Sequence, residues 1–361
     1  MQLDHLPTEL LLHIFYSCDS ISDVLNLAST SRRLRHVSSA SQKLSILANA
    51  ADAEFGPLED IIQLVTQNAS QPAHLSREAS LSDALLQQIV TVGRVARKWE
   101  SIYPIKKWKI DFENRRLLSQ EECFRLRRAV YRLWLYHRAF HNVCYDRFSR
   151  RLLNVVVERA QLLHNWSTVE LAEIEDIRMI IQDVVQNHIC PSNGTIQRKF
   201  QKQFPDSTQP LAFNIHLNYP PERAFSASPC FCPDRNVNFM EQCFYSVHPT
   251  SNSNRCASNF AARLRADLFR DPGREGWGDE IPHYYVVQDM LKLDPAQVLW
   301  LRDNAPLKEN VEIYIRSLGD WFKDNGETFG DTLEWVMKER GEDPNKLRET
   351  IEEKGIGIVG C

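Results

Sequence analysis

The residues of this 361-residue chain best suited to metal chemistry lie in a proline-rich stretch. They are four cysteines and one histidine: Cys230, Cys232, Cys243, His248 and Cys256. Thiolate sulfur and imidazole nitrogen are preferred ligands of tetrahedral Zn²⁺, so four of these side chains could hold one structural zinc ion. The first two cysteines are separated by a single residue, a poor match to zinc modules, and free cysteines often pack as small apolar side chains. Zinc is therefore an alternative interpretation, and we expect no other cofactor.

A second segment is dense in side chains that recognise proteins. Residues 276–285 read Gly-Trp-Gly-Asp-Glu-Ile-Pro-His-Tyr-Tyr. Because tryptophan and tyrosine dominate binding hot spots, we predict that this segment contacts a protein substrate. The predicted contact residues are Trp277, His283, Tyr284 and Tyr285. The structural alternative is that Trp277 fills a core and an acidic residue caps a helix that begins near His283.

The motifs of well-known catalytic sites are missing from the sequence. It contains no G-x-S-x-G, Walker loop, H-E-x-x-H or kinase motifs. Residues 355–360, Gly-Ile-Gly-Ile-Val-Gly, match the dinucleotide-binding pattern literally, but that pattern requires a preceding strand and a following helix. Here a charged helical pattern precedes the glycines. We therefore expect a flexible tail at 354–361 and a protein that is not an enzyme, although a Cys–His pair formed in space would leave no local motif.

Charge is distributed unevenly along the chain. Residues 94–151 contain 16 basic and 6 acidic residues, whereas the chain from residue 263 onward contains 14 basic and 21 acidic residues. Basic residues interleaved with aromatics can bind single-stranded nucleic acid. In this chain the aromatics fall on the apolar stripe of a helix, so we expect no nucleic-acid partner. Instead, the basic helix near Ser119 to Phe140 is expected to pack against the acidic C-terminal half.

Helices are the elements that must position these segments. Ser119 with Glu122 and Ser167 with Glu170 are two capping boxes that predict helix starts. Residues 39–56 are small and polar and are typical of a linker or of a frayed continuation of the N-terminal helices. The fold is predicted to be mainly α, with one large helical domain at 57–353. Within it, a Pro- and Cys-rich insertion at 205–256 contains the alternating pattern of a short strand, and no repeat of 20–50 residues is visible.

The first forty-five residues form a pattern of three short helices. Leu10, Leu11, Ile14, Phe15 and Cys18 make one apolar stripe at helical spacing, preceded by a proline suited to a helix start. Ser22 or Asp23 is predicted to cap the second helix, and Ser31 the third. Such a small module buries little surface alone, so a partner or the rest of the chain must cover its apolar face.

These residues resemble an F-box, the module by which substrate receptors bind the Skp adaptor of cullin-based ubiquitin ligases. The resemblance is carried by Leu6-Pro7, Glu9-Leu10 and Ile14-Phe15, then Asp23-Val24-Leu25 and Ser31-Arg32-Arg33. Leu34 stands where the family commonly has tryptophan. The resemblance implies an F-box-like domain at 1–45 and a Skp-binding surface. The implied surface consists of Leu6, Pro7, Leu10, Ile14, Phe15, Val24, Leu25 and Leu34.

The expected function is a substrate receptor within a ubiquitin ligase complex. Its partners would be Skp, a cullin through Skp, and a protein substrate. A helical scaffold that uses the module outside a ligase is the alternative. We expect an intracellular protein, cytoplasmic or nuclear and not secreted. Charged residues near the N-terminus argue against a signal peptide, nine scattered cysteines favour a reducing compartment, and no apolar run is long enough to span a membrane.

Overall fold

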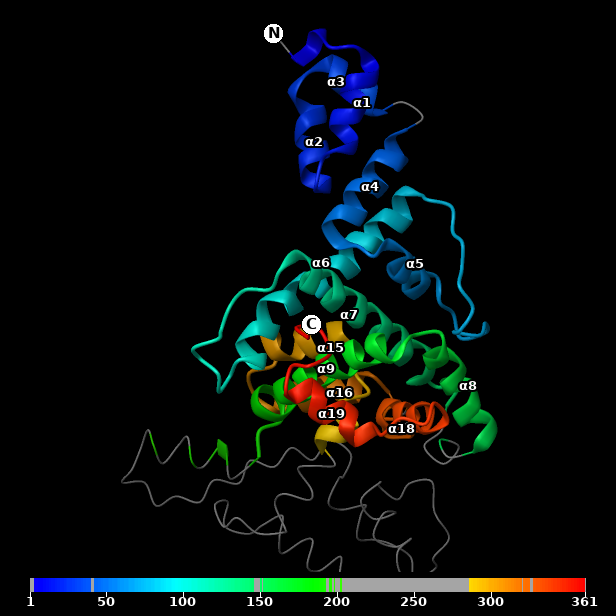
Figure 1. Ribbon diagram of the computed structural model, residues 1–361, viewed down its shortest axis with the longest axis vertical. Coiled ribbons are helices and arrows are strands. Elements are labelled where there is room, and N and C mark those ends of the chain that lie inside the picture. The colour runs from blue at the N-terminus through cyan, green and yellow to red at the C-terminus, as the bar shows by residue number, and fades with distance from the viewer. Residues whose placement is uncertain are drawn as a thin grey trace, which may run out of the picture. The chain divides into compact units, whose positions relative to one another are not determined.

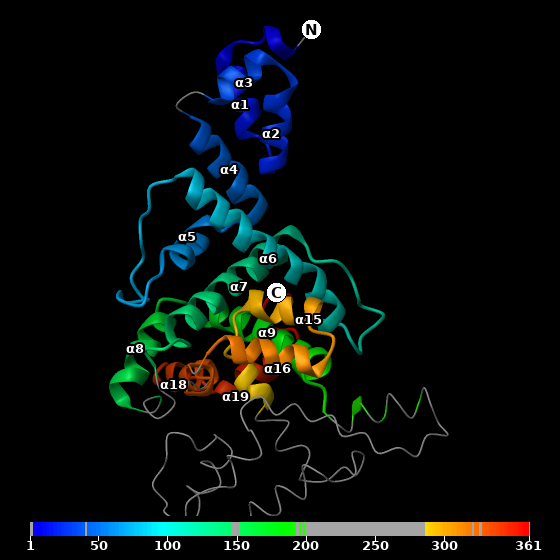
Figure 2. The ribbon, with the colours of Figure 1, turned by 180° about the vertical axis from the view of Figure 1, so that it is seen from behind.

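The chain is described by a computed structural model (Figures 1 and 2). The described residues are 3–39, 42–145, 150, 152–192, 195–196, 198, 202, 286–319, 321–324 and 327–360. Within these ranges the regular structure is helical and contains no strand, which confirms the mainly α prediction. The insertion at 205–256, the candidate zinc ligands and the candidate substrate residues Trp277, His283, Tyr284 and Tyr285 lie outside the described residues.

Contacts between residues divide the chain into two compact units. The first unit contains residues 1–140, 152–180 and 329–361, and the second contains residues 141–151 and 181–328. The N-terminal helices therefore share a unit with much of the central chain and with the C-terminal helices. This grouping depends on contacts between distant segments, which a linear pattern does not reveal.

The N-terminal helices are η1 (Leu3–His5), α1 (Thr8–Tyr16), α2 (Ile21–Thr30) and α3 (Arg32–Ser39). Both α1 and α2 pack on α3 and on the following helix, α4 (Lys43–Phe55). Ser20 caps α2 by accepting a hydrogen bond from the Asp23 backbone N–H at 3.0 Å, so the predicted caps Ser22 and Asp23 lie inside the helix. The predicted cap of α3 is confirmed, since Ser31 Oγ accepts from Leu34 N–H at 3.1 Å.

Helix α4 replaces the predicted linker. Its small residues, which looked like a linker pattern, allow close packing, and Ala48, Ala50 and Ala51 are buried. Two hydrogen bonds attach it to the end of α1. The amide of Asn49 donates to the carbonyl of Tyr16 at 2.7 Å, and the hydroxyl of Tyr16 donates to Ser45 at 3.2 Å. Alanine is the best helix former, so a run of small residues is compatible with a buried helix as well as with a linker.

The first unit continues with five helices and closes with two from the C-terminal region. They are α5 (Leu58–Thr66), α6 (Asp83–Lys107), α7 (Gln120–Phe140), α8 (Leu153–His164), α9 (Thr168–Val184, to Ile180 in this unit), α18 (Phe329–Glu339) and α19 (Pro344–Glu352). Both capping boxes are confirmed. Ser119 N–H donates to Glu122 at 2.7 Å, and Ser167 N–H donates to Glu170 at 2.8 Å, with each serine hydroxyl accepting in return.

The end of α4 is fixed to α2 and to α6. One carboxylate oxygen of Glu54 accepts from the Ile21 backbone N–H at 3.1 Å, and the other accepts from Arg97 of α6 at 2.8 Å. Phe55 is 2% exposed and lies against Gly93 of α6, where an added Cβ would come within 2.4 Å of the phenyl ring. The glycine therefore permits close approach of these two helices.

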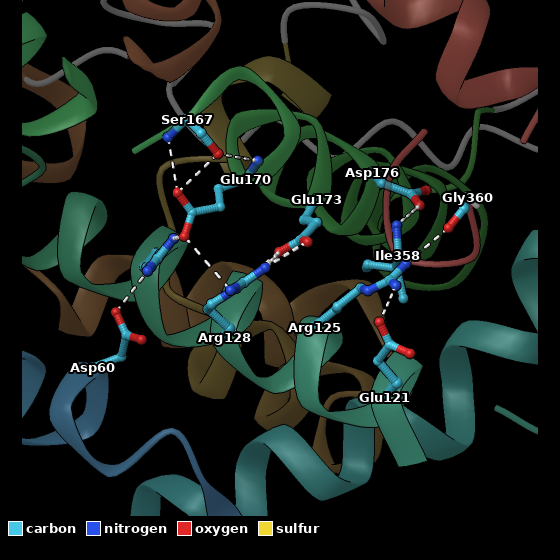
Figure 3. Close-up of polar contacts among 11 residues, drawn as sticks. Asp60, Glu121, Arg125, Arg128, Ser167, Glu170, Glu173, Asp176, Ile358 and Gly360 are labelled. Carbon is cyan, nitrogen blue, oxygen red and sulfur yellow. Dashed lines mark hydrogen bonds and ion pairs between the residues drawn. The ribbon is translucent and has the colours of Figure 1, made fainter. Parts of the chain in front are cut away.

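Arginines of α7 form a ladder of ion pairs along one side of the helix (Figure 3). Arg128 contacts Glu173 through three hydrogen bonds of 2.6–3.0 Å. Arg132 donates to Asp60 at 2.9 Å and to Glu170 at 2.6 Å. Helix α7 contacts the C-terminal region, where the hydroxyls of Tyr136 and Thr332 lie 2.9 Å apart, but the carboxylate partners of Arg128 and Arg132 come from α5 and α9.

The C-terminal segment predicted as a flexible tail, 354–361, is packed in the structure through residue 360. Ile358 is completely buried, and its backbone N–H donates to Asp176 at 3.1 Å. Arg125 donates to the carbonyl of Gly360 at 2.8 Å, which Figure 3 shows beside the Asp176 contact. The flexible-tail prediction therefore differs from the structure. The difference arises because a glycine-rich backbone can approach a buried carboxylate closely.

Acid sensitivity is expected from Glu175 in α9. Burial by itself raises the pKa of this carboxyl, but the charges of Arg178 and Arg348 outweigh burial and lower the pKa. The depressed pKa stabilises the folded chain above the unfolded value, about pH 4.3, and this contribution is lost as pH falls through the lower folded value. In urea unfolding compared at about pH 6 and about pH 3, Glu175→Gln should lose less stability on acidification than the parent chain.

The matched control is Glu352→Gln, which replaces an exposed carboxylate in α19. Equal losses on acidification in the Glu175→Gln and parent proteins would contradict the assignment to Glu175.

The second unit contains η3 (Val185–Ile189), α15 (Pro295–Asn304), α16 (Lys308–Ser317) and α17 (Trp321–Asp324). Helix α15 begins at Pro295, with Asp294 and Gln297 forming a capping box. The indole of Trp300 stacks on Tyr314 with ring centroids 4.6 Å apart. Helices α15 and α16 therefore meet through a partly exposed aromatic pair.

Candidate functional site

Large apolar side chains remain exposed on the N-terminal helices. Leu10 in α1 is 48% exposed, Leu25 in α2 is 55% exposed and Leu3 in η1 is 42% exposed. Pro7 is also exposed, and Leu6 and Ile14 are half-buried. Exposed apolar residues on one small module are typical of a surface that binds another protein.

Three of the predicted contact residues belong to the core of the module instead. Phe15 is fully buried, Val24 is 3% exposed and Leu34 is 1% exposed. The sequence pattern assigned these side chains to the binding surface because they share the apolar stripes of their helices with the exposed leucines. In the structure these three side chains are buried, whereas Leu10 and Leu25 are exposed.

The segment before α1 is held by backbone and side-chain contacts. Arg33 of α3 donates to the carbonyl of Leu6 at 2.8 Å. The carbonyl of Pro7 accepts from the N–H groups of Leu10 and Leu11, both at 3.1 Å. The exposed Pro7 and Leu10 are therefore held by hydrogen bonds to the helices of the module, and they need little ordering when a partner binds.

The comparison with protein families matches these helices. An F-box-like family model matches residues 3–44, which span η1 to α3 and the start of α4. The N-terminal module is an F-box-like domain. Neither the curated proteins nor the solved structures gave a match to the chain. The F-box-like domain indicates a Skp-binding adaptor role in a ubiquitin ligase.

The F-box-like domain begins with an exposed apolar residue that sequence reasoning missed. Leu3 is exposed like Leu10 and Leu25, but it lies ahead of the Leu6-Pro7 pair on which the resemblance was built. Two features of the sequence could have pointed to Leu3: it is a large apolar residue, and it lies three residues before Leu6. The caps and the Arg33 contact show that residues from all three helices of the F-box-like domain support this surface.

Two other kinds of site were sought in the described part of the chain. No group of three or more His, Cys, Asp or Glu side chains that could hold a metal ion occurs among the described residues. Of the helices that the structure describes, none combines the length and apolar character needed to cross a membrane.

Proposed function

We propose that this protein is a substrate-recognition adaptor that docks on Skp through its F-box-like domain and presents a protein substrate for ubiquitination. Skp would connect it to a cullin. The proposal includes an intracellular location and no catalytic activity of its own. One observation carries it: an F-box-like domain in which Leu3, Leu10 and Leu25 are exposed while Phe15, Val24 and Leu34 are buried.

The packing supports docking without rearrangement. Phe15, Val24 and Leu34 already fill the interior, so exposed Leu10 and Leu25 are not required to close the domain. Burying a leucine at an interface contributes about 1.5–3 kcal/mol of hydrophobic free energy before the costs of association. Two such residues, flanked by Leu6 and Pro7, would contribute to the contact with an apolar surface on Skp.

The first test changes the exposed leucines. Leu10→Asp with Leu25→Asp should weaken the affinity for purified Skp about 100-fold, because two desolvated carboxylates would replace two apolar contacts. Binding is measured by isothermal titration calorimetry on the full chain. The matched control is Leu152→Asp with Leu153→Asp, since these leucines are 54% and 64% exposed and lie outside the F-box-like domain.

The control variant should bind Skp like the parent chain. If both variants bind Skp equally well, the docking surface is assigned wrongly. Leu6→Ala with Pro7→Ala should also weaken Skp binding, by a smaller factor, without lowering the thermal unfolding temperature of the remainder.

Co-purification with a cullin distinguishes the adaptor from the scaffold alternative. An adaptor should co-purify with both Skp and a cullin, whereas a scaffold outside a ligase would retain at most Skp.

The zinc alternative is tested by metal analysis of the folded, full-length protein. About one zinc per chain would support a site built from Cys230, Cys232, Cys243, His248 and Cys256. Trp277, His283, Tyr284 and Tyr285 stay the predicted substrate contacts.

A further inference from the structure

The segment that enters α1 is not fixed by a side-chain cap. Pro7 occupies the N-cap position of α1, with φ −55° and ψ 149°, and makes no side-chain capping bond. Helices α2 and α3 differ, because the hydroxyls of Ser20 and Ser31 accept backbone N–H groups of their first turns. The position of the Leu6-Pro7 pair ahead of α1 therefore depends on other contacts.

The peptide group between Leu6 and Pro7 offers a single hydrogen-bonding group. Proline has no backbone N–H, so only the carbonyl of Leu6 can bond at this point of the chain. Arg33 of α3 donates to that carbonyl at 2.8 Å. The N–H of Leu6 donates to the carbonyl of Leu3 at 3.2 Å. Arg33 therefore ties α3 to the backbone that lies between the exposed side chains of Leu3 and Pro7.

The structure distinguishes Arg33 from its neighbour in the sequence. Arg32 and Arg33 both belong to the pattern that resembles an F-box, and both side chains are exposed. Successive residues of an α-helix point about 100° apart around its axis. Within the described part of the chain, Arg33 rather than Arg32 bonds the segment before α1. The two arginines are therefore expected to have different roles.

Docking of a partner would change the surroundings of this hydrogen bond. The contact between Arg33 and the Leu6 carbonyl is exposed to solvent in the free chain. A partner that covers Leu3, Leu6 and Pro7 would exclude water from it, and hydrogen bonds are stronger where the dielectric constant is low. Without Arg33, docking would bury the Leu6 carbonyl without a donor. The bond should therefore contribute more to partner binding than to folding of the free chain.

We propose that Arg33 is a positioning residue for Skp docking. Its guanidinium holds the Leu6-Pro7 backbone so that Leu3, Leu6 and Pro7 present a preformed contact, which lowers the ordering cost of binding. This inference rests on the proposed adaptor function and deepens it, because Arg33 would act on Skp affinity through the residues that it holds.

The first experiment compares Arg33→Met and Arg33→Lys in the full chain. Methionine is unbranched but carries no donor, so Arg33→Met should weaken the affinity for purified Skp about ten-fold. Lysine retains a charged donor and should restore part of the affinity. Isothermal titration calorimetry measures binding. The thermal unfolding temperature of both free variants should stay within about 2 °C of the parent value, since the contact is exposed before docking.

A double-mutant cycle tests whether Arg33 acts through the segment before α1. In the Leu6→Ala with Pro7→Ala background, Arg33→Met should cause a further loss of Skp affinity of about two-fold or less, because the side chains that it positions are missing. Arg32→Met is the matched control. Its effect on Skp affinity should be the same in the parent chain and in that background.

Hydrogen exchange gives a measurement that does not involve Skp. In the free chain, Arg33→Met should speed millisecond exchange of the Leu6 amide and leave the amides of α2 at the parent rates. Unchanged exchange at Leu6 would contradict the positioning role.

The binding data can overturn the inference in three ways: unchanged Skp affinity of Arg33→Met, equal losses with and without Leu6 and Pro7, or a fall in unfolding temperature that assigns Arg33 to domain stability. A parent chain that does not bind Skp would refute the adaptor function and this role with it. Skp binding that is indifferent to Arg33 would refute only this inference.

Discussion

Replacing Asp176 by alanine should destabilise the protein by about 3–5 kcal/mol, the range expected when one partner of a buried ion pair is removed. Its carboxylate accepts from Lys107 at 2.9 Å, from the hydroxyl of Tyr103 at 2.7 Å and from the Ile358 N–H at 3.1 Å. The alanine variant would leave these donors without that acceptor in the interior. Equilibrium urea unfolding, monitored by circular dichroism, measures the change in the free energy of unfolding.

The surroundings of Asp176 explain the size of this effect. The side chain of Asp176 is 1% exposed and that of Lys107 is 9% exposed. Burial raises the pKa of Asp176, while Lys107 and Tyr103 counteract that shift by stabilising the ionised form. Removing the carboxylate therefore leaves the buried lysine without a counter-charge, so the free-energy cost of its desolvation is no longer offset.

An exposed ion pair supplies the matched control. Lys43 and Asp83 are 3.4 Å apart, but their side chains are 49% and 72% exposed. Asp83→Ala should change the free energy of unfolding by less than about 1 kcal/mol, because water screens such pairs. A loss of similar size for both alanine variants would contradict the assigned role of burial. Gly357→Ala offers a second check, since an added Cβ would come within 2.8 Å of the Asp176 carboxylate and the backbone φ there is +105°.

Phe55→Ala is expected to destabilise the chain by about 3–5 kcal/mol, as for other fully buried aromatic side chains. The phenyl ring fills the contact between α4 and α6, against Gly93. The carbonyl of Phe55 also accepts a hydrogen bond from the buried hydroxyl of Tyr131 at 2.8 Å. Truncation would leave a cavity where the helix that carries the F-box-like domain joins α6. Urea unfolding of the single variant measures the loss.

A compensating substitution tests the geometry of this contact. Gly93→Leu alone should destabilise the chain by about 1–3 kcal/mol, because its side chain would overlap the ring of Phe55. In the Phe55→Ala background the same leucine would partly fill the cavity, so the double variant should be more stable than the sum of the two losses predicts. Additive losses would show that the two positions do not share the contact. The single variants provide the matched controls.

Local interactions made several elements predictable from residues close in sequence. Both capping boxes form between residues three positions apart, and the end of the α9 helical run before Pro191 follows from proline geometry. The F-box-like spacing was readable for the same reason. It is carried by short helices whose apolar residues recur every three or four positions.

The side of each N-terminal helix that faces the core was less predictable. Phe15 and Leu10 lie on one apolar stripe of α1, yet one is buried and the other is 48% exposed. Periodicity identifies the stripe, but only the positions of α3 and α4 decide which part of it is covered. The pattern therefore located the domain correctly, but it did not reveal that Phe15, Val24 and Leu34 are buried.

Long-range contacts decided the remainder. The glycine-rich C-terminal segment contains no signal of burial, and its acceptor Asp176 lies 182 residues earlier in the chain. Likewise, the small residues of α4 are by themselves compatible with a linker. The contacts of α4 with Tyr16, Arg97 and Gly93 are seen only in the tertiary structure. The sequence by itself determined the mainly helical class, the caps at Ser31, Ser119 and Ser167, and the F-box-like domain, because neighbouring residues make those interactions. Only the tertiary structure decided which apolar and charged groups are buried, because their partners are brought together by folding alone.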